Sequence, residues 1–217
     1  MSYNYIMVES SENLLYFLDN KPYINMTNAC TNACVFCLRN QKDDVQGAKL
    51  WMEQDNVTAG AVIAQIELKK DIILKSDEIV FCGYGEPLIK INEVVEISKY
   101  IKENFPNLKI RINTNGHANA IHKRNVALEL APYIDLISIS LNGENEEIYN
   151  LVSNPKIPNA YEEVKRFIRA CIEEKIQTIT TVVTNVPNYP VDETRCAVVA
   201  KSLGAKFRAR DFIPNGY

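Results

Sequence analysis

Short runs of β-branched and aliphatic residues alternate along this chain with longer segments of helical periodicity. Six runs have the length and composition of buried strands: Tyr23–Thr27, Glu78–Cys82, Lys109–Asn113, Ile134–Leu141, Ile176–Val183 and Ala205–Ile213. In the segments between them, apolar residues recur every three or four positions, which is typical of helices packed on one face. The helical segments are expected at 58–70, 94–105, 119–130, 164–172 and 196–203.

Strand–helix alternation without consecutive hairpins favours an α/β fold, with a parallel sheet and helices on its outside. Six strand–helix units are fewer than the eight of a complete TIM barrel, so we expect an open, partial (β/α)6 barrel. No repeat, low-complexity tract or Gly/Ser linker divides the sequence. We therefore expect residues 1–217 to form one domain, with 1–20 as an N-terminal extension and 23–214 as the barrel core. Chemistry in such folds lies in the loops after the strands.

The composition is that of an ordinary globular protein. Hydrophobic residues make up 47% of its 217 residues, enough for a core that needs no disulfides, and the net charge is −3. No basic stripe indicates a nucleic-acid surface, and no apolar run or basic amphipathic helix indicates a membrane. The first twenty residues lack the features of a signal peptide, so we expect a cytoplasmic protein with no membrane partner.

Three of the six cysteines, Cys30, Cys34 and Cys37, form a C-x3-C-x2-C cluster. Thiolates are the standard ligands of iron–sulfur clusters, and a short loop can wrap a cluster only when its ligands recur every three or four residues. Three ligands on a four-iron cluster would leave one iron open to a cofactor or substrate. Zinc is the competing interpretation, although a structural zinc site normally has a fourth Cys or His ligand.

Two other groups of residues are expected to have structural roles. The scattered cysteines lack pair spacing and are expected to pack in the core: Cys82, Cys171 and Cys196. Lys206, Arg208 and Arg210 alternate on the last strand and therefore share a face. We favour the interpretation that these charges protect an edge strand from pairing with another sheet. On a face turned into the barrel, they would instead bind an anionic substrate.

The second predicted strand ends in Cys-Gly-Tyr-Gly-Glu-Pro, residues 82–87. Alone, this run would indicate a strand-to-helix turn. Following the cysteine loop, it resembles the Gly-Gly-Glu-Pro element of the radical S-adenosylmethionine (radical SAM) superfamily. The resemblance implies that Cys30, Cys34 and Cys37 hold a 4Fe–4S cluster. It also implies that the amino group of SAM is bound by Gly83, Tyr84, Gly85 and Glu86. Tyr84 replaces the usual glycine, and its backbone is still able to make the contact.

The resemblance continues at the later strand ends, in the expected order. Asn113 opens an Asn-Thr-Asn-Gly run similar to the Thr-Asn-Gly turn of activating enzymes in this superfamily, although a simple turn is an equal alternative. Ser140 and Asn142 match positions that contact the ribose and carboxylate of SAM, and Phe36 matches an aromatic position near the adenine. The small size and the Cys-Gly-Tyr-Gly-Glu-Pro run further resemble stand-alone radical SAM proteins associated with TatD-type nucleases.

The resemblance implies an enzyme whose reduced cluster cleaves SAM to a 5′-deoxyadenosyl radical, which abstracts hydrogen from a substrate. An electron donor such as flavodoxin or ferredoxin is then required. A small metabolite, as for a deazapurine synthase, and a partner protein, as for a glycyl-radical activase, both stay open as substrates. A non-catalytic iron–sulfur or zinc module is the alternative of another class. Because little chain flanks the predicted barrel to form a lid, we expect a macromolecule, protein or nucleic acid, to plug its mouth.

Overall fold

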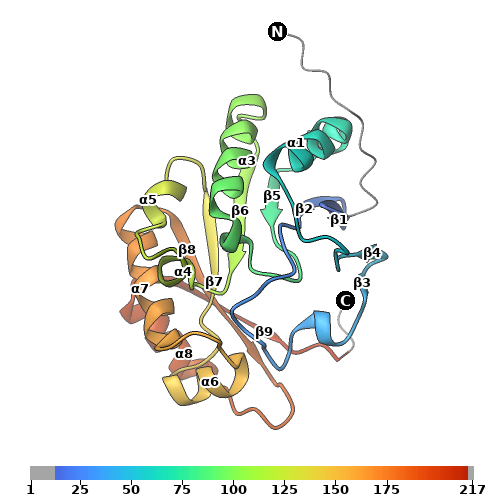
Figure 1. Cartoon of the computed structure of the whole chain (residues 1–217). Helices are drawn as coiled ribbons and strands as arrows, with labels where there is room; N and C mark the ends of the chain where they lie inside the picture. The colour runs from blue at the N-terminus through green and yellow to red at the C-terminus, as the bar shows by residue number, and fades with distance from the viewer. Residues whose placement is uncertain (1–12, 215–217) are drawn as a thin grey trace.

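The computed structural model describes residues 13–214, which form a seven-stranded sheet curved into an open, partial barrel (Figure 1). The strands follow one another across the sheet in the order β1 (Leu15–Leu18), β2 (Lys21–Ile24), β5 (Glu78–Phe81), β6 (Lys109–Thr114), β7 (Leu136–Ser140), β8 (Gln177–Thr184) and β9 (Lys206–Asp211). Strands β2, β5, β6, β7, β8 and β9 run parallel to one another. The predicted α/β class and six-stranded partial barrel are confirmed, and β1 and β9 are its two open edges.

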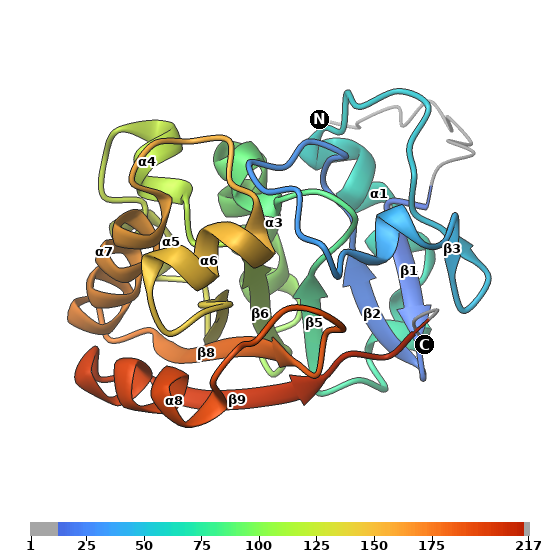
Figure 2. The same cartoon turned by 90° about the horizontal axis from the view of Figure 1, so that it is seen from below.

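Helices cover the outer face of the sheet, and Figure 2 shows α7 and α8 along the outside of β8 and β9. The helices are α1 (Ala59–Leu68), α2 (Lys70–Ile73), α3 (Ile91–Asn104), α4 (Ala118–His122), α5 (Ala127–Leu130), α6 (Glu146–Ser153), α7 (Ala160–Glu173) and α8 (Glu193–Ser202). Short 3-10 turns, η1 and η2, span Leu38–Asn40 and Pro87–Lys90, and a small hairpin pairs β3 (Asp44–Val45) with β4 (Ala48–Lys49). Between residues 13 and 214, no helix is long and apolar enough to cross a membrane.

Side-chain caps fix where three of these helices begin. Thr58, Asn145 and Asp192 each accept a hydrogen bond from a backbone N–H in the first turn of α1, α6 and α8. The segment 119–130 was expected to be one helix but forms two, α4 and α5. Lys123 ends the first of them in the left-handed conformation, with φ at 54°.

The β1–β2 hairpin contradicts the expectation that the chain has no consecutive hairpins. Strand β1 lies within residues 1–20, which were expected to be an extension outside the sheet, and it pairs antiparallel with β2. The two strands are joined by Asp19 and Asn20, both with positive φ, as a two-residue hairpin turn requires. The remainder of the predicted extension, residues 1–12, lies outside the described residues.

The two faces of the sheet have different chemistry because side chains alternate along each strand. The outer face is fully buried against the helices and includes Ile79, Phe81, Ile110, Ile112, Ile137 and Ile139. The inner face is polar and lines a cavity with Tyr23, Arg111, Asn113, Ser138, Ser140 and Thr181. A packed apolar core therefore lies between sheet and helices, and the barrel interior is left as a polar chamber.

Candidate active site

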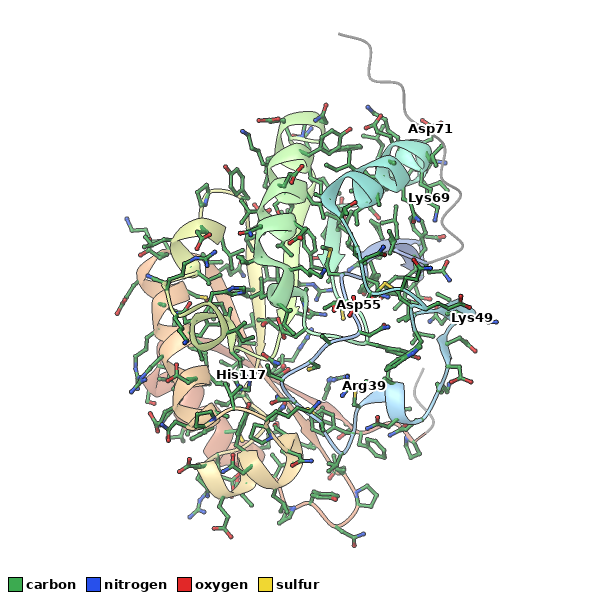
Figure 3. All side chains as sticks on the ribbon, in the orientation of Figure 1. Arg39, Lys49, Asp55, Lys69, Asp71 and His117 are labelled. Atoms are coloured by element: carbon green, nitrogen blue, oxygen red, sulfur yellow. The ribbon has the colours of Figure 1, made fainter. Side chains whose placement is uncertain are left out.

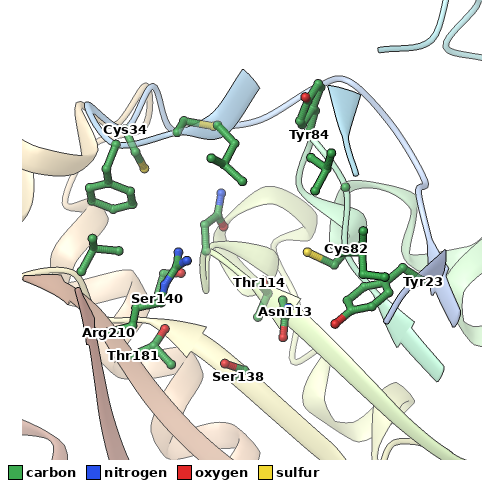
Figure 4. Close-up of a pocket in the computed structure, with 18 of the residues that line it drawn as sticks. Tyr23, Cys34, Cys82, Tyr84, Asn113, Thr114, Ser138, Ser140, Thr181 and Arg210 are labelled. Atoms are coloured by element: carbon green, nitrogen blue, oxygen red, sulfur yellow. The ribbon is translucent and has the colours of Figure 1, made fainter. Parts of the chain in front are cut away.

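The concave side of the sheet encloses a cavity of about 730 Å³ (Figure 4). Its walls bring together residues that lie far apart in the sequence. The predicted site residues among them are Cys30, Cys34, Phe36, Cys37, Gly83, Tyr84, Gly85, Glu86, Asn113 and Ser140. Because all six parallel strands end on the same side of the barrel, their following loops meet there. Asn142 is the one predicted site residue that does not line the cavity.

The loop that carries the cysteines is held from both sides by charged side chains (Figure 3). The Asp55 carboxylate accepts hydrogen bonds from the Thr27 hydroxyl at 2.6 Å and from the Asn28 backbone N–H at 3.1 Å. Arg39 donates to the backbone oxygens of Asn28 and Asn32. These contacts satisfy backbone groups that would otherwise be unpaired, so the protein itself fixes the path of the loop.

The thiol groups of Cys30, Cys34 and Cys37 are half-buried at the cavity. Burial raises the pKa of Cys34 to about 12, so metal binding would have to release its proton. In the described part of the chain, no three His, Cys, Asp or Glu side chains are grouped so as to hold a single metal ion. Three thiols without a fourth ligand fit a 4Fe–4S cluster, whose irons are ligated separately, better than one zinc ion.

Behind the cysteine loop, a buried polar network centres on His117, which Figure 3 labels. Its Nδ1 lies 2.8 Å from the Thr31 hydroxyl and its Nε2 lies 2.8 Å from the Tyr149 hydroxyl. The Asn115 amide donates to Thr31 at 2.9 Å and lies 3.7 Å from the Cys30 sulfur. Burial lowers the pKa of His117 to about 4, so the ring is neutral at pH 7. The network thus ties the loop to β6 and α6.

Sequence reasoning missed this role of His117, because the residue lies far along the chain from the cysteines. The available signal was its place directly after the Asn115-Gly116 turn at the end of a predicted strand. Residues at that end of a barrel strand face the site.

Gly85 lies where two backbone segments meet. A Cβ atom at this position would lie 2.1 Å from the Thr27 carbonyl oxygen and 2.6 Å from the Ala29 carbonyl oxygen. The next N–H, that of Glu86, donates to the same Ala29 oxygen at 2.8 Å. At Gly83, a Cβ would lie 1.9 Å from Asn25 Oδ1. The glycines therefore let the turn pack directly against the segment that leads into the cysteine loop.

Tyr84, which stands where the superfamily element usually has glycine, lines the cavity and has its side chain held at both ends. Its hydroxyl donates to the Lys42 backbone oxygen at 2.7 Å. Its ring packs in a small cluster with Tyr16, Val45 and Leu50. The substitution therefore contributes packing without removing the backbone groups of the turn from the cavity.

Glu86 is the buried carboxylate of the cavity, with 2% of its surface exposed. Its Oε1 accepts hydrogen bonds from the Thr114 hydroxyl at 2.7 Å and from the Leu88 N–H, and its Oε2 accepts one from the Asn115 N–H at 2.6 Å. Burial raises the pKa of Glu86 to about 7, although these hydrogen bonds oppose the rise. Because each carboxylate oxygen accepts two hydrogen bonds, Oε2 keeps capacity for a further donor.

This pKa gives a testable pH dependence. If Glu86 pairs with the amino group of SAM, binding strengthens as Glu86 ionises, and the ionised fraction rises about tenfold between pH 6 and pH 8 for a pKa of about 7. We expect the dissociation constant of SAM, measured by anaerobic calorimetry, to fall several-fold over that range, and Glu86→Gln to abolish the trend. A pH trend retained in Glu86→Gln would assign it to another group.

Asn142 is placed differently from the prediction. Its amide donates to the Ser153 hydroxyl at 2.9 Å and lies 4.0 Å from the Cys34 sulfur. The residue is buried, with a positive φ of 58° that turns the chain after β7. Instead of lining the cavity, Asn142 packs behind the cysteine loop.

Two structural interpretations also change. Cys82 was expected in the core, but it lines the cavity (Figure 4), whereas Cys171 and Cys196 are buried as predicted. Strand β9 is an edge of the sheet as expected, yet Arg208 and Arg210 face the cavity. Protection of the edge is therefore not a complete account of these two arginines.

Comparison with known proteins decides the family. The profile of the "Radical SAM superfamily" matches residues 24–195, from the end of β2 into α8. The chain belongs to this superfamily. Radical SAM enzymes use a 4Fe–4S cluster and SAM, so the chain is a radical SAM enzyme with these cofactors. The narrower likeness to TatD-associated proteins stays a prediction.

Individual proteins match this chain at low sequence identity. The dual-specificity RNA methyltransferase RlmN of Dichelobacter nodosus is 25% identical over 161 residues, which cover 68% of this chain and 39% of the relative. Thus the match spans about two fifths of the relative's length. Crystal structures of Streptococcus suis SuiB share the fold at 14% identity, covering 88% of this chain. For the SuiB complex with S-adenosylmethionine, the TM-score is 0.64 and the match covers 40% of the SuiB chain. For the complex with the precursor peptide SuiA, the TM-score is 0.63 and the match covers 39% of the SuiB chain.

Proposed function

We propose that this radical SAM enzyme binds its cluster through Cys30, Cys34 and Cys37 and abstracts a hydrogen atom from a macromolecular substrate. The observation that carries the proposal is the meeting of the three thiols and the Gly-Tyr-Gly-Glu turn at one cavity. The cysteine loop is the more specific motif and the turn the less specific one, and at one strand-end face they would supply a cluster site and a cofactor site.

Each part of the cavity has a distinct task in this proposal. The cluster and SAM, when bound and reduced by one electron, supply methionine and a 5′-deoxyadenosyl radical that takes a hydrogen atom from the substrate. Glu86 offers Oε2 to the amino group of SAM, while Phe36 and Ser140 provide apolar and hydroxyl contacts on other walls. A flavodoxin or ferredoxin would supply the electron. The surrounding residues orient the reactants and exclude water.

A macromolecular substrate is supported by the open barrel. Strands β1 and β9 do not pair with each other, and the cavity between them reaches the surface. A radical must be shielded when it forms, and a large substrate can close the opening itself. Two of the similar proteins have macromolecular partners: RlmN is an RNA methyltransferase, and SuiB binds a precursor peptide.

Deuterium transfer tests the proposal. Reconstituted, reduced enzyme would be given SAM and extracts of cells grown in heavy water, divided into RNA, protein and small-molecule fractions. We expect deuterium in 5′-deoxyadenosine only with a macromolecular fraction, and none with a Cys30, Cys34 and Cys37 triple alanine variant. Efficient transfer from the small-molecule fraction alone would overturn the macromolecular assignment.

A further inference from the structure

Strand β9 presents two arginines to the barrel interior. Arg208 and Arg210 alternate along the strand and therefore project from the same face, and both line the cavity. In the register of the sheet they lie beside Thr181 and Val183 of β8. Figure 4 shows Arg210 on the same wall as Ser140 and Thr181. Residues two apart on a strand are about 7 Å apart along it, so the two positive groups reach a common space.

Several other charged groups at the cavity have partners within the protein. Glu78 lies 2.6 Å from Lys21 and 3.4 Å from Arg111, so it serves both cations. The Asp211 carboxylate, next to Arg210 in the chain, accepts hydrogen bonds from Asn185 at 2.7 Å and from Thr184.

Arg208 and Arg210 differ from these groups. Within residues 13–214, neither has a carboxylate within 4.0 Å. Two like charges facing one cavity repel each other, and an anion bound between them would remove that repulsion.

Two buried polar atoms on the wall of the same cavity also have unused hydrogen-bonding capacity. Asn113 Oδ1 and Arg111 Nε, both on β6, are buried and have no hydrogen-bond partner among the described residues. Both residues line the cavity. A buried polar atom without a partner is costly, so the cavity is suited to a polar occupant. The Arg111 Nε–H can donate to an anion, whereas the Asn113 oxygen accepts and requires a donor.

We propose that Arg208 and Arg210 bind a phosphate monoester group of the substrate. The assignment rests on the proposed function and names the chemistry of its substrate. A carboxylate would neutralise one of the two arginines, whereas a phosphate monoester carries a charge of about −1.5 to −2 near neutral pH. The guanidinium fork also matches phosphate oxygens in pairs. Lys206 lies on the same strand but does not line the cavity. It would protect the edge of the sheet without binding the phosphate.

Binding of inorganic pyrophosphate to the cluster-loaded enzyme, with SAM saturating, tests the proposal by calorimetry. We expect pyrophosphate to bind the wild type and Lys206→Gln equally, and to bind the Arg208→Gln/Arg210→Gln double variant at least tenfold more weakly. The single variant Arg210→Lys, which keeps the charge but not the fork, should be intermediate. SAM affinity should be unchanged in all variants, because the arginines serve the substrate.

Three outcomes would overturn the assignment. The first is pyrophosphate binding in the double variant that equals the wild type. The second is malonate binding that is as tight as pyrophosphate binding. The third is a loss of SAM affinity that accompanies the loss of pyrophosphate binding.

Circular dichroism would verify the fold of the double variant, which changes only exposed side chains. The readout is independent of radical chemistry. Pyrophosphate binding without SAM cleavage would refute the proposed function alone, and SAM cleavage without pyrophosphate binding would refute this inference alone.

Discussion

Replacing Cys34 with alanine is expected to eliminate both the iron–sulfur cluster and the formation of 5′-deoxyadenosine. Two remaining thiols leave the cubane with two unligated irons, and Cys82, the other cysteine at the cavity, lies on the turn after β5 and not in the cysteine loop. Iron and sulfide analysis after anaerobic reconstitution, followed by SAM cleavage with dithionite, would measure the loss. We expect less than about a tenth of wild-type iron.

The matched control is Cys171→Ala, which removes a cysteine buried in the core on α7. This change should lower the free energy of unfolding by on the order of 1 kcal/mol and leave the cluster intact. Full iron content in Cys34→Ala, or its loss in Cys171→Ala alone, would show that the cysteine loop is not the cluster site.

The second large effect is expected from Gly85→Ala. The added methyl group would meet the Thr27 and Ala29 carbonyl oxygens at 2.1 and 2.6 Å, and backbone atoms cannot rotate away as a side chain can. The turn and the segment leading to Cys30 must then separate. We expect a loss of roughly 3–5 kcal/mol in the free energy of unfolding, measured by denaturant titration, together with loss of cluster binding.

Gly60→Ala provides the comparison for this variant. Gly60 lies in α1, and a Cβ there would have no neighbour within 4 Å. Because alanine favours helix over glycine, this variant should gain stability, by less than about 1 kcal/mol since Gly60 lies in the first turn, and bind its cluster normally. A Gly85→Ala protein as stable as the wild type would mean that the turn and the cysteine loop are not packed together as described.

The strands and the site's strand-end location could be predicted from the sequence because both follow from local patterns. Continuous runs such as Glu78–Phe81 and Gln177–Thr184 are long enough to identify buried parallel strands. The parallel order then places every strand end on one side. The Gly-Tyr-Gly-Glu turn was consequently expected beside the cysteines, where the structure has it.

The features that were missed depend on contacts between distant segments. His117 gains its role from Thr31 and Tyr149, which approach it only after the barrel has formed. Helix α6, which supplies Tyr149, is short, and its two-turn apolar pattern is too brief to stand out. The β1–β2 hairpin depends on two positive φ angles at Asp19 and Asn20, where no glycine marks the turn.

The sequence also left the direction of some side chains undetermined. The alternation of side chains along a strand predicts correctly that Arg208 and Arg210 share a face. The same alternation does not determine which face of the strand lines the barrel interior. For a fully buried strand, the apolar pattern would decide. Strand β9 is an exposed edge with partly buried residues on its outer face, so only the register with β8 settles the direction.

Mössbauer spectroscopy of protein reconstituted with iron-57, with and without SAM, tests the central claim most directly. Three thiolates and one open iron predict one 4Fe–4S cluster per chain, with SAM changing the spectrum of one of its four irons. Stoichiometric zinc without sulfide in protein purified without oxygen, or a cluster whose four irons do not respond to SAM, would contradict the account.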